Sequence, residues 1–297
     1  MHKEIKEKIT FVNNNKNKHS IKLLCQCLEV PRAVYYYHTE GRINSYEVNN
    51  NILDASIRKV YGDSKGRYGS PKITVILNNN GTYVSQKRVA RRMKRMGLRS
   101  VVIKKFKPAS SKTTDDKVVR HDLLKQNFNA SKPGEKWLGD ITYIWTKEQG
   151  WTYLAIILDL FDLKVIGWEY GINMTEDLVI KALKKAVINR QPIANMIFHS
   201  DRGSQYISNN YETLLKNLNI KHSYSKKGYP YDNASMESFN AILKKEEINL
   251  HTYCEYEEVK LIIFEFIESW YNNIRIHSTL GYITPNQKYQ NYLLTTI

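Results

Sequence analysis

The sequence is poor in cysteine and has no long apolar run. Its three cysteines, Cys25, Cys27 and Cys254, are too few for a disulfide framework, and the one residue between Cys25 and Cys27 does not match the two-residue gap of a zinc knuckle. No stretch approaches roughly 18 uninterrupted apolar residues, and the N-terminal segment MHKEIKEKIT lacks the apolar region of a signal peptide. We therefore expect reduced cysteines in a cytoplasmic protein that neither crosses a membrane nor is secreted.

Acidic residues are scarce in the first part of the chain, which concentrates the positive charge there. The whole sequence has a formal net charge of +16. Residues 1–130 contain 27 basic and 10 acidic residues, whereas residues 131–297 contain 18 and 19. The segment 87–107 has ten Lys or Arg and no carboxylate. This asymmetry favours a polyanionic partner, nucleic acid, over the alternative of a solvated basic face.

The rest of the composition is that of a globular protein. Hydrophobic residues make up 42% and charged residues 25% of the 297 positions, which argues against wholesale disorder or a fibrous repeat. A chain of this length typically forms about two domains.

The basic half reads as helices with helix-turn-helix outlines. Residues 20–37 predict two helices separated by a break at 29–31, and residues 46–62 predict another helix. A second helix pair is predicted at 71–79 and 85–96, with Ser85 as the N-cap of its second helix. Modules of this kind typically bind DNA.

The helix expected at 85–96 has an apolar stripe of Val89, Met93 and Met96. Its arginines recur at three- and four-residue spacings: Arg88, Arg91, Arg92 and Arg95. One side of this helix can therefore pack while another meets phosphate. We expect these four arginines to contact DNA; the alternative is an exposed helix with arginine for solubility.

Residues 104–134 are rich in Lys, Ser, Thr and Asp and predict a linker with one short helix near 120–127. The pattern then changes to strands and helices. The expected strands are 136–145, 151–160, 164–170, 194–199 and 221–225, and the expected helices are 175–189, 209–218, 233–250 and 256–274. This order predicts a mixed five-stranded sheet with flanking helices, the order of a ribonuclease-H-like fold in the α/β class.

Three carboxylates occupy positions where the local pattern favours apolar or neutral residues. Asp140 lies inside the first strand, Asp201 follows the fourth, and Glu237 lies in the first turns of a helix. A lone carboxylate in such a strand is unfavourable unless it is paired or bound to metal. Adjacent first and fourth strands would bring Asp140 and Asp201 together, and a helix across the sheet would add Glu237. Such a set of oxygen ligands favours two Mg²⁺ or Mn²⁺ ions.

Several other residues near these acids have structural readings. Asp159 and Asp162 lie at a strand end and a turn, and His199, two residues before Asp201, is more readily a satisfied buried histidine than a substrate-orienting one. Tyr231, Asp232 and Asn233 are expected to shape the turn and cap the following helix.

The C-terminal segment 271–285 contains Arg275 among aromatic residues. This composition suits DNA contact, but it suits a packing element that closes the domain equally well.

Three blocks resemble the catalytic blocks of DDE transposases and retroviral integrases: WLGDITYI (137–144), FHSDRGSQY (198–206) and KKGYPYDNASMESFNAILKKE (226–246). The blocks at 68–100 and 270–285 are similar to those of the second-reading-frame, OrfB-type transposases of insertion-sequence family three, so the resemblance covers nearly the whole chain. Two departures are Gly-Tyr-Pro at 228–230, where the family usually has Gly-Asn-Pro, and the lack of the His-His-Cys-Cys zinc pattern of retroviral integrases.

The resemblance implies a helical DNA-binding region at 1–103, a linker at 104–134 and a ribonuclease-H-like integrase core with a helical tail at 135–297. It implies a DDE-type polynucleotidyl transferase in which Asp140, Asp201 and Glu237 hold two divalent ions. Lys244, two helical turns after Glu237, is then expected to touch DNA near the cleavage point.

The implied reaction cleaves DNA at transposon ends and transfers the 3′-hydroxyl to a target phosphodiester. The implied partners are the terminal inverted repeats, target DNA, further copies of the chain, and a first-frame (OrfA) product that is separate or fused by frameshifting. Two alternatives remain open at this point: a DNA-binding remnant without catalysis, and a ribonuclease-H-type nuclease that cuts but does not join.

Overall fold

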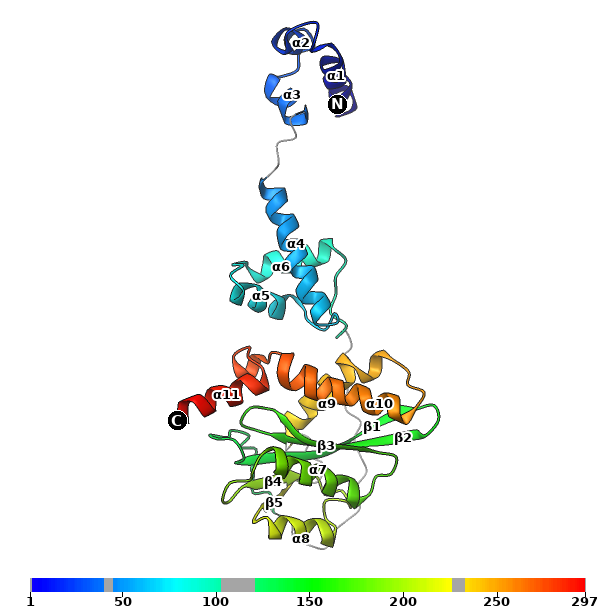
Figure 1. The fold of residues 1–297 in the computed structure, drawn as a ribbon, viewed down its shortest axis with the longest axis vertical. Helices are drawn as coiled ribbons and strands as arrows, with labels where there is room; N and C mark the ends of the chain where they lie inside the picture. Colours follow the sequence, from blue (N-terminus) through cyan, green and yellow to red (C-terminus); the bar gives the residue numbers. More distant parts are fainter. Residues whose placement is uncertain (1, 40–44, 103–120, 226–232, 297) are drawn as a thin grey trace.

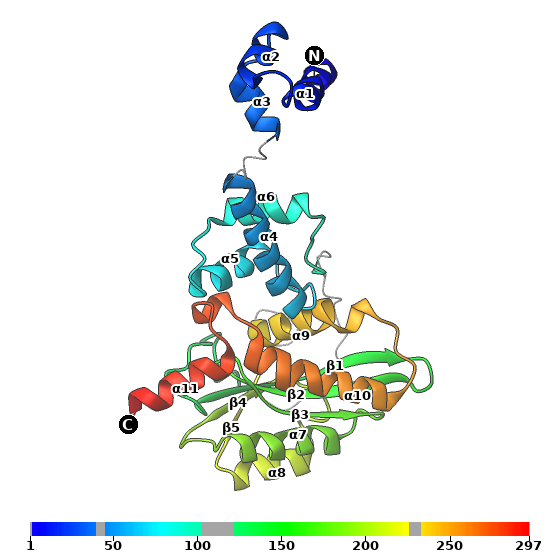
Figure 2. The ribbon, with the colours of Figure 1, turned by 45° about the horizontal axis from the view of Figure 1, so that its top comes forward.

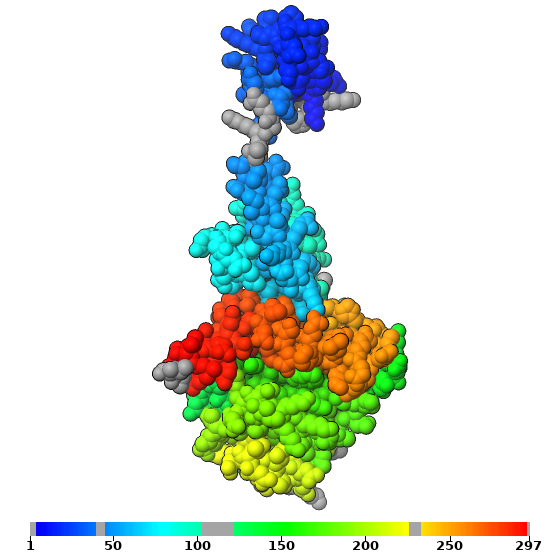
Figure 3. All heavy atoms as spheres, in the orientation of Figure 1, coloured from blue at the N-terminus to red at the C-terminus, as the bar shows by residue number. Residues whose placement is uncertain are grey.

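The computed structural model describes residues 2–39, 45–102, 121–225 and 233–296. These residues form three successive parts along the long axis of the molecule: a small N-terminal helical unit, a central helical unit and an α/β unit (Figures 1 and 3). The C-terminal helices lie on the side of the α/β unit that faces the central unit (Figure 2).

The N-terminal unit contains α1 (His2–Asn15), α2 (Ile21–Cys27) and α3 (Arg32–Thr39). Ser20 caps α2 by accepting a hydrogen bond from the Leu23 amide, and Glu29 adopts a φ of 57° between α2 and α3. The expected pair of helices with a break at 29–31 is thus confirmed. Sequence analysis did not anticipate α1, whose Val12 is fully buried against the pair.

The central unit contains α4 (Ser45–Asp63), α5 (Ser70–Asn79) and α6 (Gln86–Arg95). Ser85 is the N-cap of α6, as expected, and accepts a hydrogen bond from the Arg88 amide. Ile57, Ile73 and Val89, one from each helix, are fully buried and form the centre of its core. The three helices therefore make a packed unit whose basic helix is α6.

The sheet has the strand order β3-β2-β1-β4-β5. Its strands are β1 (Lys136–Thr146), β2 (Gly150–Asp159), β3 (Val165–Gly171), β4 (Ile197–Ser200) and β5 (Lys221–Tyr224). The first three strands are antiparallel, whereas β4 is parallel to both β1 and β5. The expected mixed five-stranded sheet is confirmed, including the adjacency of the first and fourth strands.

Helices cover both faces of the sheet (Figure 1). One face packs against α7 (Glu176–Asn189) and α8 (Asn209–Asn217), and the other against α9 (Ala234–Glu246) and α10 (Tyr256–Phe264). Successive residues of a strand point to opposite faces. Trp137 accordingly belongs to the first layer and Leu138 to the second, and both are fully buried.

The C-terminal part differs from the expected single helix at 256–274. The α-helix α10 continues as a π-helix, η3 (Glu265–Ile274), and the chain ends in α11 (Pro285–Thr296). Within η3, the side-chain amide of Asn272 donates to the Val165 carbonyl and accepts from the Val165 amide, each at 3.0 Å. The wider π turn thus brings a polar side chain to the edge strand β3.

One further element differs from expectation. The short helix predicted near 120–127 does not form over 121–127, because Lys125 and Gln126 adopt φ values of 47° and 58° in a turn. Within the described ranges, no helix has the length and apolar character needed to cross a bilayer.

Candidate active site and DNA-contact residues

Asp140 lies on β1 at the point where its parallel neighbour stops. Strand β4 pairs with β1 only from Lys136 to Leu138 and ends at Ser200. Residues beyond Leu138 are therefore open on that side, and Asp201 directly follows the end of β4. Gly139, the residue before Asp140, allows the ring of Phe198 to approach β1 closely, since a Cβ at position 139 would clash with that ring.

The two aspartates interact electrostatically. Desolvation, followed by the negative charge of Asp201, raises the pKa of Asp140 to about 7. Desolvation also raises the pKa of Asp201, although this residue is exposed, and its Oδ1 accepts a hydrogen bond of 2.9 Å from the Gly203 amide. The structure therefore places these two acids near enough for the charge of Asp201 to act on Asp140.

Helix α9 places two more groups at Asp140. The amide nitrogen of Asn240 donates a 2.7 Å hydrogen bond to Asp140 Oδ2. The charge of Lys244 acts on Asp140 and lowers its pKa, while desolvation lowers the pKa of Lys244 itself. Glu237, Asn240 and Lys244 follow spacings of three and four and share one helical face. Our sequence reasoning missed Asn240, which this spacing from Glu237 could have revealed.

Glu237 is on the expected helix but its carboxylate is exposed, and desolvation alone accounts for its raised pKa. Among the described residues, no group of three or more His, Cys, Asp or Glu side chains is close enough to hold a metal ion. The structure thus brings Asp140 and Asp201 together but does not place Glu237 with them. Converging carboxylates repel unless a cation lies between them. The residues 226–232 that precede the helix, with Tyr231 and Asp232, lie outside the described part.

The groups around Asp140 nevertheless fit a hard divalent cation. A carboxyl group with a pKa of about 7 gains from a neighbouring positive charge. The side-chain oxygen of Asn240 is buried and has no hydrogen-bond partner among the described residues. Oxygen donors of this kind suit Mg²⁺ or Mn²⁺.

The four arginines of α6 divide into two pairs. Arg92 forms an ion pair with Asp54, with Nε to Oδ1 at 2.7 Å, and Arg88 donates to Asn50 Oδ1 at 3.1 Å. Both acceptors belong to α4. The expectation that Arg88 and Arg92 contact DNA does not match these positions, because both side chains are half-buried and hold α6 against α4.

The second pair of arginines, Arg91 and Arg95, is better placed to contact nucleic acid than the first. Arg91 and Arg95 are exposed, as are the neighbouring Lys87 and Lys94. No acidic residue occurs in α6. These four side chains form the basic face of α6.

Arg275 is not placed for DNA contact. It is 7% exposed, and its NH2 and Nε atoms donate to both carboxylate oxygens of Glu246 at 2.8 to 3.1 Å. Of the two readings of segment 271–285, packing is the one that the position of Arg275 supports.

Other candidates have structural roles. Asp159 and Asp162 are fully buried, and both form ion pairs with Arg190 at 2.8 and 2.7 Å. His199 is fully buried and lies 2.9 Å from Ser223 Oγ through its Nδ1. Asn233 is the N-cap residue of α9 but its side chain makes no capping hydrogen bond, contrary to expectation.

Two solved structures resemble parts of the chain. The HTLV-2 integrase catalytic core domain in complex with magnesium, in its trimeric form, matches with a TM-score of 0.43 and 17% identity, covering 54% of this chain and 99% of that one. A simian T-cell lymphotropic virus intasome in complex with the PP2A regulatory subunit B56 gamma matches with a TM-score of 0.45 and 17% identity, covering 78% and 74%.

Sequence comparison gives the family. Residues 130–230 and 218–285 match the integrase core domain, and residues 47–106 match an HTH-like domain. The transposase InsF for insertion sequence IS3A of Escherichia coli K12 is 38% identical over 94% of this chain and 97% of its own length. The transposase for insertion sequence element IS904 of Lactococcus lactis is 39% identical over 84% and 99%. With an HTH-like unit ahead of an integrase core, the chain belongs to the IS3 family of integrase-like transposases, which act in DNA transposition.

Proposed function

We propose that this transposase cleaves DNA at the ends of its element in a metal-dependent reaction and transfers the freed 3′-hydroxyl to a target phosphodiester. The observation that carries the proposal is the placement of Asp140 within β1 and of Asp201 just beyond the end of the adjacent parallel strand β4, next to the helix that bears Asn240 and Lys244. The raised pKa of Asp140 and the buried, unpartnered oxygen of Asn240 support a cation at this position.

In this proposal, Asp140, Asp201 and Glu237 hold two Mg²⁺ or Mn²⁺ ions. When bound, such ions activate the attacking oxygen and offset the charge on the leaving oxygen. The acids therefore serve as ligands and not as general bases. Glu237 lies one helical turn before Asn240, so it shares the face of α9 that contacts Asp140.

The remaining groups orient the acids and the DNA. Asn240 holds one oxygen of Asp140 in a fixed direction. Lys244, whose charge acts on Asp140, contacts a phosphate beside the reacting bond in this proposal. Arg91 and Arg95 on the basic face of α6 contact phosphates of the transposon end. Arg88, Arg92 and Arg275 are assigned to packing instead.

The proposed partners are the terminal inverted repeats, target DNA and further copies of the chain, because two transposon ends must be held together. A first-frame product, separate or fused by frameshifting, is a further proposed partner. The proposed place of action is the cytoplasm of a bacterial cell, where the DNA substrate lies.

The test uses the full chain and labelled linear DNA that carries the element's own ends, with Mg²⁺ or Mn²⁺, and compares the parent with Asp201→Asn. Joined products from the parent and none from the variant are expected. Nicks without joining would favour the nuclease alternative. A parent that binds the ends but does not react under either metal, with or without first-frame product, would indicate a DNA-binding remnant.

A further inference from the structure

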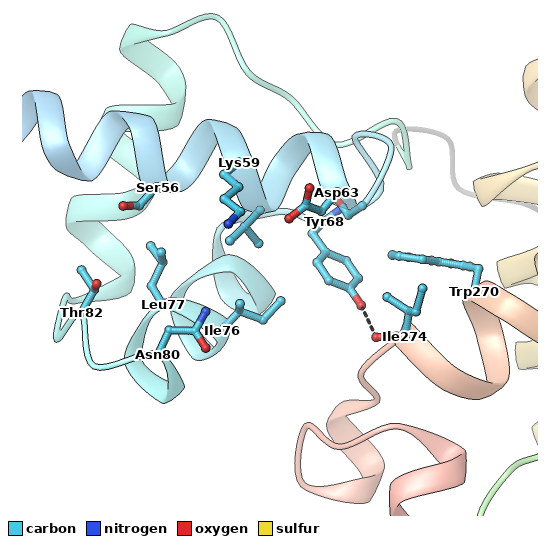
Figure 4. Close-up of a pocket in the computed structure, with 12 residues that line it drawn as sticks. Ser56, Lys59, Asp63, Tyr68, Ile76, Leu77, Asn80, Thr82, Trp270 and Ile274 are labelled. Atoms are coloured by element: carbon cyan, nitrogen blue, oxygen red, sulfur yellow. Dashed lines mark hydrogen bonds between the residues drawn. The ribbon is translucent and has the colours of Figure 1, made fainter.

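The central unit and the α/β unit meet in a buried joint. Tyr68 from the turn after α4 and Trp270 from η3 lie beside each other there, with ring centroids 5.2 Å apart (Figure 4). The Tyr68 hydroxyl donates to the Ile274 carbonyl at 3.2 Å and accepts from the Ile276 amide at 3.0 Å. A cavity of about 400 Å³ lies alongside, lined by both units. The contacts of this joint are specific and fix one unit against the other.

Arg67 is the residue of the joint that reaches the catalytic helix. Its Nε donates at 3.1 Å to the carbonyl of Glu246, the last residue of α9, and its NH2 forms an ion pair with the carboxylate of Glu247. The guanidinium carbon lies 4.6 Å from the ring centroid of Trp270. The side chain is only 4% exposed. An arginine at a helix C-terminus satisfies an orphan carbonyl and complements the helix dipole.

A rigid turn presents Arg67. Gly66 adopts a φ of 72°, and its amide donates to the Tyr61 carbonyl at 2.9 Å. The Arg67 amide donates to the Ser64 carbonyl at 3.0 Å. A residue with a Cβ at position 66 would be strained in this conformation. The backbone before Arg67 is therefore held in one shape.

The same turn is tied to the segment that follows α6. The hydroxyl of Ser100 donates to the Arg67 carbonyl at 2.9 Å, and the Val101 amide donates to the Gly66 carbonyl at 3.1 Å. The Tyr61 hydroxyl donates to the Arg99 carbonyl at 2.7 Å. The basic helix is thus connected by a short stretch of hydrogen-bonded backbone to the arginine that contacts α9.

Residues of the α/β unit also hold the C-terminal end of α9. The carboxylate of Glu246 accepts from Arg275 and from Trp270 Nε1, the latter at 3.1 Å. Helix α9 then runs back to Asn240, which contacts Asp140. The distance along the helix from Glu246 to Glu237 is roughly 13.5 Å at about 1.5 Å per residue. Because the helix is one element, its orientation at the Arg67 end sets the positions of the groups near Asp140.

We propose that Arg67 is a positioning residue of the transposition reaction. Arg67 binds the C-terminal end of α9. In this way it couples the orientation of Glu237, Asn240 and Lys244 to the central unit, which binds the transposon end through α6. Arg67 itself touches neither the acids nor DNA. The inference rests on the proposed function, since it concerns the rate of cleavage at those acids.

The test compares Arg67→Gln, Glu247→Gln and their double variant with the parent. The readouts are affinity for transposon-end DNA and the single-turnover rate of end cleavage at saturating protein. Lys65→Gln is the control for an ion pair across the same joint that does not reach α9, because Lys65 pairs with Glu265 on η3 and both side chains are exposed. We expect a rate decrease for Arg67→Gln on the order of 10- to 100-fold with end affinity unchanged. Glu247→Gln, which keeps its size, should be intermediate, and the double variant no slower than Arg67→Gln alone.

Parent-like rates in Arg67→Gln or Glu247→Gln would overturn the proposal. An equal loss in Lys65→Gln, or a loss of affinity that matches the loss of rate, would also overturn it, since either indicates general adhesion between the units. Hydrogen exchange of residues 234–246 supplies a readout that needs no activity. Transposon-end DNA should slow the exchange of these amides in the parent and not in Arg67→Gln. Equal protection in both proteins refutes the coupling, whether or not the parent is active. An inactive parent would reject the proposed function separately.

Discussion

Asn240 and Asp140 are joined by a 2.7 Å hydrogen bond between residues 100 positions apart, one on α9 and one on β1. The amide donates, so the bond stabilises the ionised carboxylate and opposes the desolvation and the charge of Asp201 that raise its pKa. Asn240 therefore keeps this acid closer to the charged state that a metal ligand needs.

Replacing Asn240 with Ala should raise the pKa of Asp140 further above about 7. A hydrogen bond to a charged group contributes roughly 1.5–3 kcal/mol, which corresponds to a rise of about one to two pH units. Carboxyl NMR titration of the metal-free protein measures it, with Asp140→Asn to assign the signal. An unchanged titration would show that the bond has no part in setting the charge of this acid.

Asp140→Asn should stabilise the metal-free protein at pH 8 and have little effect at pH 4. The folded pKa of about 7 lies above the ordinary 3.8, so between these values the folded state binds more protons and stability falls as pH rises. Removing the ionisable group removes that loss, which is on the order of 1–4 kcal/mol. Urea unfolding at both pH values measures it. Asp177→Asn, at an exposed position, is the control; a gain of the same size at pH 4 would contradict the assignment.

Mg²⁺ or Mn²⁺ should raise the melting temperature of the parent at pH 8 and leave that of Asp201→Asn unchanged. Ligands that bind only the folded state stabilise it by mass action, by about 2.7 kcal/mol at a concentration 100 times the dissociation constant. Differential scanning calorimetry with and without EDTA gives the comparison. Equal shifts in both proteins would place the cation elsewhere.

The two pairs of arginines on α6 should behave differently when changed to Gln. Arg91→Gln with Arg95→Gln should weaken DNA binding and reduce the salt slope by about 0.9 for each phosphate that is no longer neutralised, with the fold intact. Arg92→Gln should instead lower thermal stability, because Asp54 loses its partner. Binding isotherms at several salt concentrations, beside thermal unfolding, separate the two effects. A reduced salt slope in Arg92→Gln would show that Arg92 contacts a DNA phosphate.

Arg275→Gln should destabilise the α/β unit strongly. It leaves the carboxylate of Glu246, with a side-chain exposure of 5%, buried without its cation. Breaking such a pair typically costs about 3–5 kcal/mol. Arg275→Lys should recover only part of this, because the ammonium lacks the planar fork of donors with which the guanidinium binds both carboxylate oxygens. Chemical denaturation measures the loss; a fully stable variant with weaker DNA binding would favour the DNA-contact reading instead.

The strands could be predicted because each depends on local signals, whereas the adjacency of the first and fourth strands was expected from the order of elements along the chain. Ile, Val, Trp and Tyr runs mark the strands, and an isolated acid in such a run needs a partner. The start of α6 at Ser85 was predictable for the same reason, since a cap is a local feature.

What could not be predicted depends on tertiary contacts. Arg88 and Arg91 cannot be told apart from the sequence pattern. Only the position of α4 decides that Arg88 bonds to Asn50 while Arg91 is exposed. Arg275 pairs with a glutamate 29 positions away. The π turn at Glu265–Ile274 depends on how Asn272 meets β3. Local periodicity carries none of this information.

The two aspartates stand on strands of very different length. Asp140 lies within an eleven-residue strand that is paired with β2 along ten positions, whereas Asp201 follows a strand of four residues. The short strand is paired with both β1 and β5, but Asp201 itself lies beyond its last paired residue, Ser200. In the proposed site, one carboxylate would therefore be held by a long ladder of backbone hydrogen bonds and the other by the loop after β4, so any adjustment to the DNA substrate would fall to Asp201.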